Sequence, residues 1–338
     1  MAVEIATGEA VVLAENHGGG FQFDYSPGAN VIAYTDGSSH YIHLLNLDGM
    51  KSAAVWHEAE GVIGGPLSIS HCGTRIAFWA MMPSVESRWF DSYVTVIFAL
   101  DVDPVECRLV RPAWVVEAYP RRKLASGTVH VNHPQINPAN RDHICYSHEM
   151  HGATPDGSVA MCRLWQVMAD GDQNRYLVRQ PAGLHFTHEV IAPDGKSLIF
   201  AYMFGVGQVE FGTFEKRSLY YNPGCCPGHL TVSPDQEWIA GDTWGDWRDG
   251  RGEPVQSVMM LNVKSRKFAH LCWMPRSGGH PTHPHPNFSP DCTKIAFTRL
   301  VDGTGQVAYV DVGRVMAEWD AVAQGVGQEG SPEFARVV

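Results

Sequence analysis

The residues best suited to chemistry in this 338-residue chain are histidines in its last quarter. Residues 279–286 read Gly-His-Pro-Thr-His-Pro-His-Pro, which places His280, His283 and His285 in one short segment. The alternating prolines exclude a helix and favour an extended backbone. His283 and His285 are two positions apart, so their side chains project to the same side of that backbone. Because imidazole is a good ligand for divalent transition metals, the segment predicts a metal site. The alternative is a surface loop that binds nothing.

A repeated turn connects this segment to distant histidines. Variants of Ser-Pro-Asp-Gly recur along the chain, with the second position at residues 27, 71, 138, 193, 234 and 290. The residues five places earlier form one column, which consists of Gln22, Pro66, His133, His188, His229 and His285. If the turns are structurally equivalent, these imidazoles converge although they are far apart in the sequence. His229 then joins His283 and His285 as a third metal ligand, with His280 as a fourth donor.

Other residues suggest proton transfer and substrate binding. His188 lies in the column but outside the His-Pro segment, so its neutral imidazole is a candidate general base. The alternative is a structural histidine. His133 is a candidate for substrate contact or for a hydrogen bond to a strand, and His148 is a second candidate for substrate contact. Arg163 lies among apolar residues, where a guanidinium needs a carboxylate partner from the protein or a ligand.

Two tryptophans follow the fifth turn. Trp244 and Trp247 alternate with acidic residues and are candidates for stacking against sugar rings. Packing between sheets explains the same two residues equally well.

The repeated turn also predicts the elements that position these residues. Each repeat contains an apolar strand, the turn, a second strand such as residues 295–297, and further alternating segments. Proline fixes φ in such a turn, and Asp-Gly supplies the corner with positive φ. About four strands per repeat, at spacings of 41 to 67 residues, are typical of the blades of a β-propeller. A β-sandwich does not repeat one turn six times, so we expect an all-β propeller with four-stranded antiparallel blades.

The number of blades follows less directly from the pattern. Six motifs are visible, but we expect seven blades, the seventh combining residues 9–14 with strands from the C-terminal end; six blades is the alternative. We expect residues 1–323 to form a single propeller domain, with a helix at residues 315–323. Residues 324–338 have little pattern and are expected to form a C-terminal tail.

Composition excludes several classes of function. The 25 basic and 36 acidic residues give a net charge of −11, which argues against binding nucleic acid. No apolar segment approaches the ~20 residues that a membrane span needs, and no secretory signal is visible. The eight cysteines lack a Cys-x-x-Cys pair, so we expect reduced thiols in a soluble, cytoplasmic protein. A peptidase is disfavoured because the chain has no Gly-x-Ser-x-Gly motif. The oligomeric state is not indicated.

The ordered motifs resemble those of the oligogalacturonate lyases, polysaccharide lyase family 22. They are Arg163-Leu-Trp, Thr-His188-Glu, Gly-His229 and His283-Pro-His285-Pro, and the resemblance runs from about residue 125 to residue 312. It implies a seven-bladed propeller that holds a manganese-type ion through three histidines and a glutamine. His229, His283 and His285 would be ligands, and His280 stands where the glutamine is expected. The resemblance further implies that His188 is the catalytic base and Arg163 the assisting arginine.

The implied reaction is β-elimination from a small acidic oligosaccharide. The C5 proton of a 4-linked uronate is weakly acidic, and a divalent metal on the adjacent carboxylate stabilises the charge that develops when it leaves. Arginine adds a second donor, neutral histidine takes the proton, and a 4,5-unsaturated uronate results. A hydrolase needs two carboxylates, and no carboxylate column is present. Two alternatives remain open: a non-catalytic propeller that binds sugar or protein, and a metal-dependent uronate isomerase or epimerase.

Overall fold

The computed structural model describes most of the chain in two compact units. The described residues are 2–3, 10–11, 13, 22–36, 38–83, 93–120, 122–124, 127–151, 163–178, 186–202, 204–222, 225–244, 247–276, 283–323 and 335–337. One unit is Val12–Gly183, and the other combines Met1–Val11 with Leu184–Val338. Within those ranges, no helix is long and apolar enough to cross a membrane.

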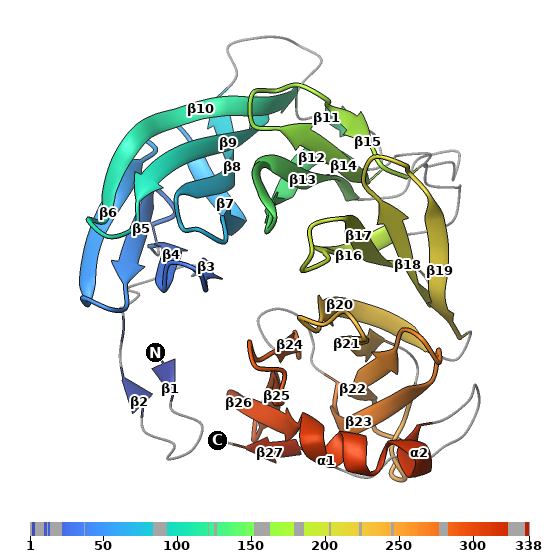
Figure 1. Cartoon of the computed structure of the whole chain (residues 1–338). Helices are drawn as coiled ribbons and strands as arrows, with labels where there is room; N and C mark the ends of the chain where they lie inside the picture. The colour runs from blue at the N-terminus through green and yellow to red at the C-terminus, as the bar shows by residue number, and fades with distance from the viewer. Residues whose placement is uncertain are drawn as a thin grey trace. The chain divides into compact units, whose positions relative to one another are not determined.

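The unit Val12–Gly183 contains three antiparallel sheets (Figure 1). The first consists of β3 (Phe23–Ser26), β4 (Val31–Thr35), β5 (Tyr41–Asn46) and β6 (Lys51–His57). The second consists of β7 (Val62–Ile69), β8 (Arg75–Pro83), β9 (Tyr93–Asp103) and β10 (Arg108–Pro120). The third has five strands: β11 (Arg122–Leu124), β12 (Gly127–Asn137), β13 (Asn140–His151), β14 (Leu164–Met168) and β15 (Arg175–Tyr176).

The second unit contains three more four-stranded sheets and a short pair, β1 (Ala2–Val3) with β2 (Ala10–Val11). The fourth sheet consists of β16 (Phe186–Ile191), β17 (Ser197–Tyr202), β18 (Gly205–Glu210) and β19 (Lys216–Tyr221). The fifth consists of β20 (Cys226–Val232), β21 (Trp238–Trp244), β22 (Val255–Asn262) and β23 (Phe268–Pro275). The sixth consists of β24 (Asn287–Phe288), β25 (Lys294–Val301), β26 (Thr304–Asp311) and β27 (Ala335–Val337).

The repeated turn forms as the sequence predicts. In the fifth sheet, the Ser233 hydroxyl accepts the backbone N–H of Trp238 at 3.0 Å, and Asp235 accepts that of Glu237 at 3.0 Å. The corner residue Gln236 takes a φ of 61°, the left-handed conformation for which Asp-Gly is suited in the parent motif. The turn that begins at residue 289 repeats these bonds. These two turns therefore fix the register of the strands that they join.

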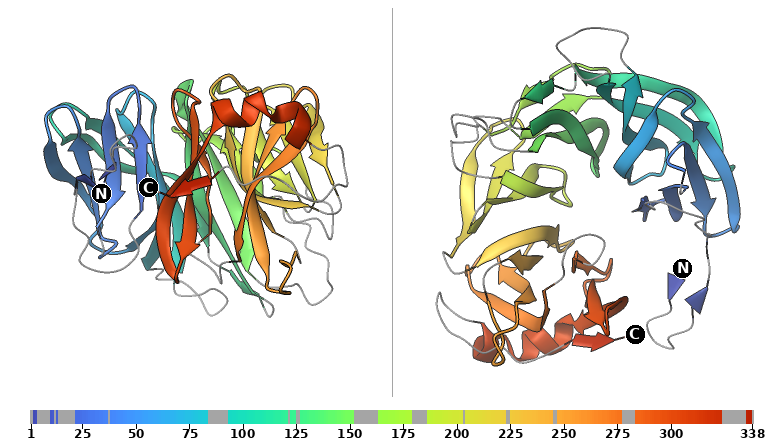
Figure 2. Two further views of the ribbon diagram at one scale, coloured as in Figure 1. Left: turned by 90° about the horizontal axis from the view of Figure 1, so that it is seen from below. Right: turned by 180° about the vertical axis from the view of Figure 1, so that it is seen from behind.

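Apolar side chains fill the space between neighbouring sheets within each unit. In the second unit, one buried cluster joins the fourth and fifth sheets through residues such as Ile199, Val232 and Met259. Another joins the fifth and sixth sheets and is covered by two short helices, α1 (Val312–Ala317) and α2 (Trp319–Val322) (Figure 2). The helix expected near residues 315–323 is therefore present, in two parts that bury Trp319 against Trp238.

These sheets confirm the all-β fold and its antiparallel propeller blades, which have four strands except for the third, where β11 adds a fifth. Within the described ranges there are six blades, which was the alternative count, and no seventh blade forms. The reason lies in two pairings. Strand β2, from the segment expected to start a seventh blade, pairs with β1. Strand β27, which lies within the expected C-terminal tail, completes the sixth blade by pairing with β26.

Candidate metal centre

The histidine column lies at a repeated β-bulge. In β12, β16 and β20, two residues of the strand face one residue of its neighbour, and the second of the two in β20 is His229. In β12 the first of the two bulge residues is His133, with a φ of 49°, and in β16 it is His188, with a φ of 52°. His285, just before β24, has a φ of 43°. Since a positive φ is unfavourable for residues other than glycine, the fold holds these side chains in set directions at a cost in strain.

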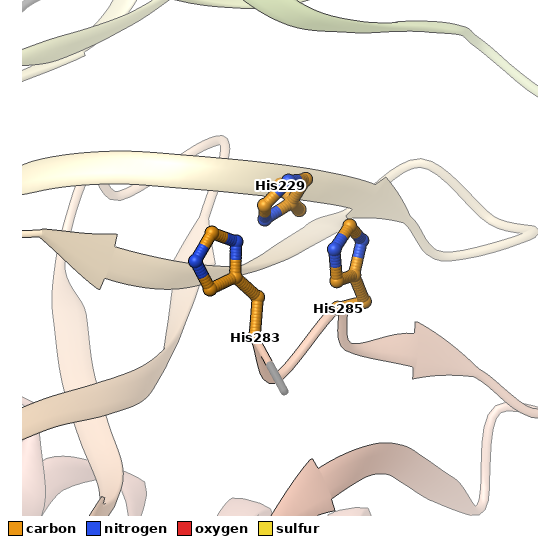
Figure 3. A group of neighbouring side chains, drawn as sticks. All are labelled: His229, His283 and His285. Carbon is orange, nitrogen blue, oxygen red and sulfur yellow. The ribbon is translucent and has the colours of Figure 1, made fainter. Parts of the chain in front are cut away.

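Three imidazoles of the second unit form a close cluster (Figure 3). One potential ligand atom from each of His229, His283 and His285 lies within 4.8 Å of the others. The ring centroids of His229 and His285 are 3.5 Å apart, and those of His229 and His283 are 5.5 Å apart. All three side chains are half-buried. In the described residues, this is the one group of histidine, cysteine or acidic side chains with such spacing.

A buried carboxylate supports the cluster. Asp242 on β21 is fully buried, and its Oδ2 lies 2.8 Å from Nδ1 of His229. Its Oδ1 accepts the backbone N–H of His229 at 2.8 Å, and its Oδ2 accepts that of His285 at 3.3 Å. Imidazoles that bind metals commonly make such a hydrogen bond through the other ring nitrogen. Three imidazoles, one of them hydrogen-bonded to a buried carboxylate, are a donor set that suits a divalent transition metal.

Local sequence explains why these groups can approach one another. Gly228 precedes His229, and a Cβ at Gly228 would overlap Oδ1 of Asp242 and come within 2.8 Å of Nε1 of Trp244. The bulge therefore needs glycine at this position. On the other side, the backbone N–H of Thr298 on β25 donates to the carbonyl of Pro284 at 2.8 Å. This bond anchors the stiff Pro-rich segment between His283 and His285.

His188 lies beside the cluster without belonging to it. Its ring centroid is 3.9 Å from that of His229 and 5.3 Å from the indole of Trp244. Trp244 is 37% exposed and lies edge-on to His188, His229 and His283. His188 therefore borders the centre from the neighbouring blade, and Trp244 offers an accessible aromatic surface next to it.

The remaining predicted site residues lie outside this unit or outside the described residues. His133, His148 and Arg163 belong to the unit Val12–Gly183. Arg163 is buried, and its carbonyl accepts the backbone N–H of His148 at 2.9 Å. The His148 ring stacks on Trp165 at 4.4 Å, and burial lowers the pKa of His148 to about 4. His280, the expected fourth donor, lies outside the described residues.

Sequence reasoning missed the part that Asp242 plays. In the sequence it is only one of the acidic residues that alternate with Trp244 and Trp247. The signal that identifies it is its setting, since Trp238-Ile-Ala-Gly-Asp242-Thr-Trp is a strand in which one carboxylate stands among buried residues. A charge is not retained in such a strand without partners. For Trp247 the alternative interpretation, packing, is the one that the structure supports. Its ring centroid lies 5.3 Å from that of Trp273 and 5.6 Å from that of His270.

Comparisons with known proteins agree with this geometry. Residues 102–315 match the family model described as oligogalacturonate lyase. An oligogalacturonate lyase from Dickeya dadantii is 28% identical over 191 residues, which cover 51% of this chain and 47% of that protein. An oligogalacturonide lyase from Pectobacterium atrosepticum is 27% identical with the same coverage. The match therefore spans about half the length of these curated relatives.

Solved structures show the same fold. A structure described as oligogalacturonate lyase in complex with manganese aligns with a TM-score of 0.71 and 20% identity, covering 91% of this chain and 80% of that one. The crystal structure of oligogalacturonate lyase from Vibrio parahaemolyticus aligns with a TM-score of 0.72 and 19% identity, covering 92% and 82%. These likenesses establish the β-propeller. Because the family model covers well over half of the residues, the chain belongs to the oligogalacturonate lyase family.

Proposed function

We propose that this chain is a metal-dependent lyase that cleaves short 4-linked galacturonate chains by β-elimination. The observation that carries the proposal is the cluster of His229, His283 and His285, whose ligand atoms lie within 4.8 Å of one another in a chain of this family. A non-catalytic propeller has no need for three clustered imidazoles, one of them hydrogen-bonded to a buried carboxylate.

Manganese is the metal that we propose. The related structure described as a manganese complex shares the fold, and the three imidazoles form a suitable donor set. His280 is retained as a proposed fourth donor. When bound, the ion neutralises the substrate carboxylate and so lowers the barrier to removal of the neighbouring C5 proton.

His188 is the proposed general base. The centroid of its ring lies 3.9 Å from that of His229, and His188 is not one of the three clustered histidines. This position supports a side chain that faces the substrate rather than the ion. Neutral imidazole is abundant at pH 7 and accepts a proton without prior activation. Departure of the C4 oxygen then leaves the 4,5-unsaturated uronate.

For substrate binding we propose three residues of the unit Val12–Gly183. We propose that Arg163 donates to the uronate carboxylate, where a planar guanidinium makes two parallel hydrogen bonds. His133, at the bulge of β12, is the second proposed contact. His148 is the third, and it is only 7% exposed.

The proposed location is the cytoplasm, and the proposed partner is an acidic oligosaccharide rather than a nucleic acid. The seven described cysteines form no disulfide with one another, which is typical of a reducing compartment. A net charge of −11 disfavours a polyphosphate partner, whereas a short uronide needs only one or two cations and a metal.

Incubation with digalacturonate tests the proposal. A lyase produces ultraviolet absorbance from the conjugated alkene, with an absolute requirement for added divalent metal after treatment with a chelator. Product analysis separates the alternatives, because an isomerase or epimerase leaves the glycosidic bond intact and produces no alkene. Absence of alkene with every divalent metal and with di- and trigalacturonate would reject the lyase assignment.

A further inference from the structure

Asp242 is a charged group in an unusual position. Its side chain is fully buried on β21, and a carboxylate in such a place needs several donors to offset the loss of hydration. It has three: Nδ1 and the backbone N–H of His229, each at 2.8 Å, and the backbone N–H of His285 at 3.3 Å. All three donors belong to residues of the imidazole cluster.

The hydrogen bond from His229 determines which ring nitrogen is available. A carboxylate accepts hydrogen bonds only, so Nδ1 of His229 must carry the proton that it donates to Oδ2 of Asp242. In the neutral ring, Nε2 then holds the lone pair. A histidine without this partner is free to adopt the other tautomer, which places the lone pair on Nδ1.

We infer that Asp242 is the positioning residue of the metal centre, fixing His229 as the tautomer that binds the ion through Nε2 and holding the backbone of His285 in register with it. The inference rests on the proposed metal site and deepens it. Asp242 joins three segments, namely β20, β21 and the Pro-rich segment before β24, so two ligands from different blades share one anchor.

The neighbouring glycine supports this assignment. Any side chain at Gly228 would overlap Oδ1 of Asp242, so the strand leaves space for the carboxylate at the point where it meets His229. The buried carboxylate also lies 2.8 Å from Nδ1 of His229 and favours a cation at the opposite nitrogen of that ring. An asparagine amide has the same shape but no negative charge. It can also turn its NH2 group toward His229, so it does not force Nδ1 to carry the proton.

The first test compares Asp242→Asn with Asp235→Asn, a surface substitution in the turn that joins β20 and β21. Binding of Mn²⁺ and Zn²⁺ to the full chain is measured by calorimetry, and folding by circular dichroism. We expect Asp242→Asn to weaken metal binding about 10- to 100-fold and Asp235→Asn to leave it unchanged. A folded Asp242→Asn protein with unaltered affinity overturns the inference. Failure of the wild-type protein to bind either metal refutes the proposed metal site instead.

A second measurement decides the matter even if the variant does not fold. In wild-type protein labelled with ¹⁵N-histidine and loaded with ¹¹³Cd²⁺, the metal should couple to Nε2 of His229 while Nδ1 retains its proton. Coupling of cadmium to Nδ1 of His229 overturns the assignment. The signal is identified by its absence from the His229→Gln protein.

Discussion

The imidazole rings of His188 and His229 lie 3.9 Å apart, centroid to centroid, although they come from the bulges of two successive blades. One of them belongs to the three-histidine cluster and the other does not. In the proposed function, His188 is the proton acceptor and His229 is a metal ligand. The first prediction separates the two roles.

Replacing His188 with alanine should reduce turnover about 10²- to 10⁴-fold, because a general base contributes that much to proton transfer. Bound metal should remain stoichiometric. Steady-state kinetics on digalacturonate and elemental analysis of the purified variant measure the two effects. His57→Ala, at an exposed position on β6, is the matched control and should behave as wild type. Near-normal elimination by His188→Ala would redirect the search for the base to His133.

Replacing His283 with alanine should remove the metal and leave the blades folded. The residue precedes β24 and contributes one of three clustered imidazoles, whereas the strands around it pack through separate apolar clusters. Elemental analysis and thermal unfolding check both parts. His71→Ala, at an exposed turn position, is the control. Stoichiometric metal in the His283→Ala protein would contradict the assignment of this residue as a ligand.

Trp244 and Trp247 should give opposite results. Trp244 is 37% exposed beside the cluster, so Trp244→Ala should raise KM about 5- to 10-fold through loss of stacking worth roughly 1 kcal/mol. Trp247 packs against Trp273, so Trp247→Ala should lower the unfolding temperature with little change in KM. Kinetics and calorimetry on both proteins check the pair. Equal KM values for the two variants would indicate that Trp244 does not contact the substrate.

Arg163 should affect binding and turnover together, since a guanidinium on the substrate carboxylate acts in the ground and transition states alike. Arg163→Lys retains the charge but loses the planar pair of donors, so kcat should fall and KM should rise. The exposed Arg217 provides the control substitution, Arg217→Lys. A change in unfolding temperature alone, with normal kinetics, would show that Arg163 serves only the packing of its unit.

His148 should make the protein sensitive to acid. Burial lowers its pKa to about 4 in the folded state, below the value near 6.5 of an unfolded histidine. The stabilisation that neutral His148 provides is complete above about pH 6.5 and is lost as the pH falls toward about 4, at up to ~1.4 kcal/mol per pH unit.

In the variant His148→Phe, the new side chain cannot be protonated, and its aromatic ring preserves the stacking on Trp165. The free energy of unfolding of this variant should therefore fall less steeply between pH 6.5 and 4 than that of the wild type. Urea denaturation across this range measures the slopes, and His57→Phe controls for histidine loss at an exposed site. Identical slopes for His148→Phe and wild type would refute the role of His148.

Local chemistry made much of this fold predictable. The turns near Ser233 and Ser289 satisfy the same backbone groups through a hydroxyl, a carboxylate and a positive-φ corner, so spacing along the sequence predicts position in the sheet. The His-Pro segment was recognisable because its prolines favour an extended backbone, in which His283 and His285 project to the same side. Column counting then placed His188, His229 and His285 together.

Long-range pairing explains what the sequence did not reveal. Whether Ala10–Val11 joins strands from the other end of the chain depends on a competition with Ala2–Val3, and no local pattern decides that. The role of Asp242 depends on a register in which one residue faces the two residues of a bulge. Such a relationship becomes visible only when both strands are aligned.

The repeated bulge has a consequence for how this protein can change. His133, His188 and His285 all occupy a left-handed conformation that glycine would adopt more readily. Glycine at His188 should therefore relieve strain and raise stability while it removes catalysis, so activity at this position opposes robustness. The blades fix the backbone conformation at the positions of this column, whereas the side chains there determine the chemistry. A new activity can therefore arise by substitutions at these positions, one blade at a time, while the turns stay unchanged.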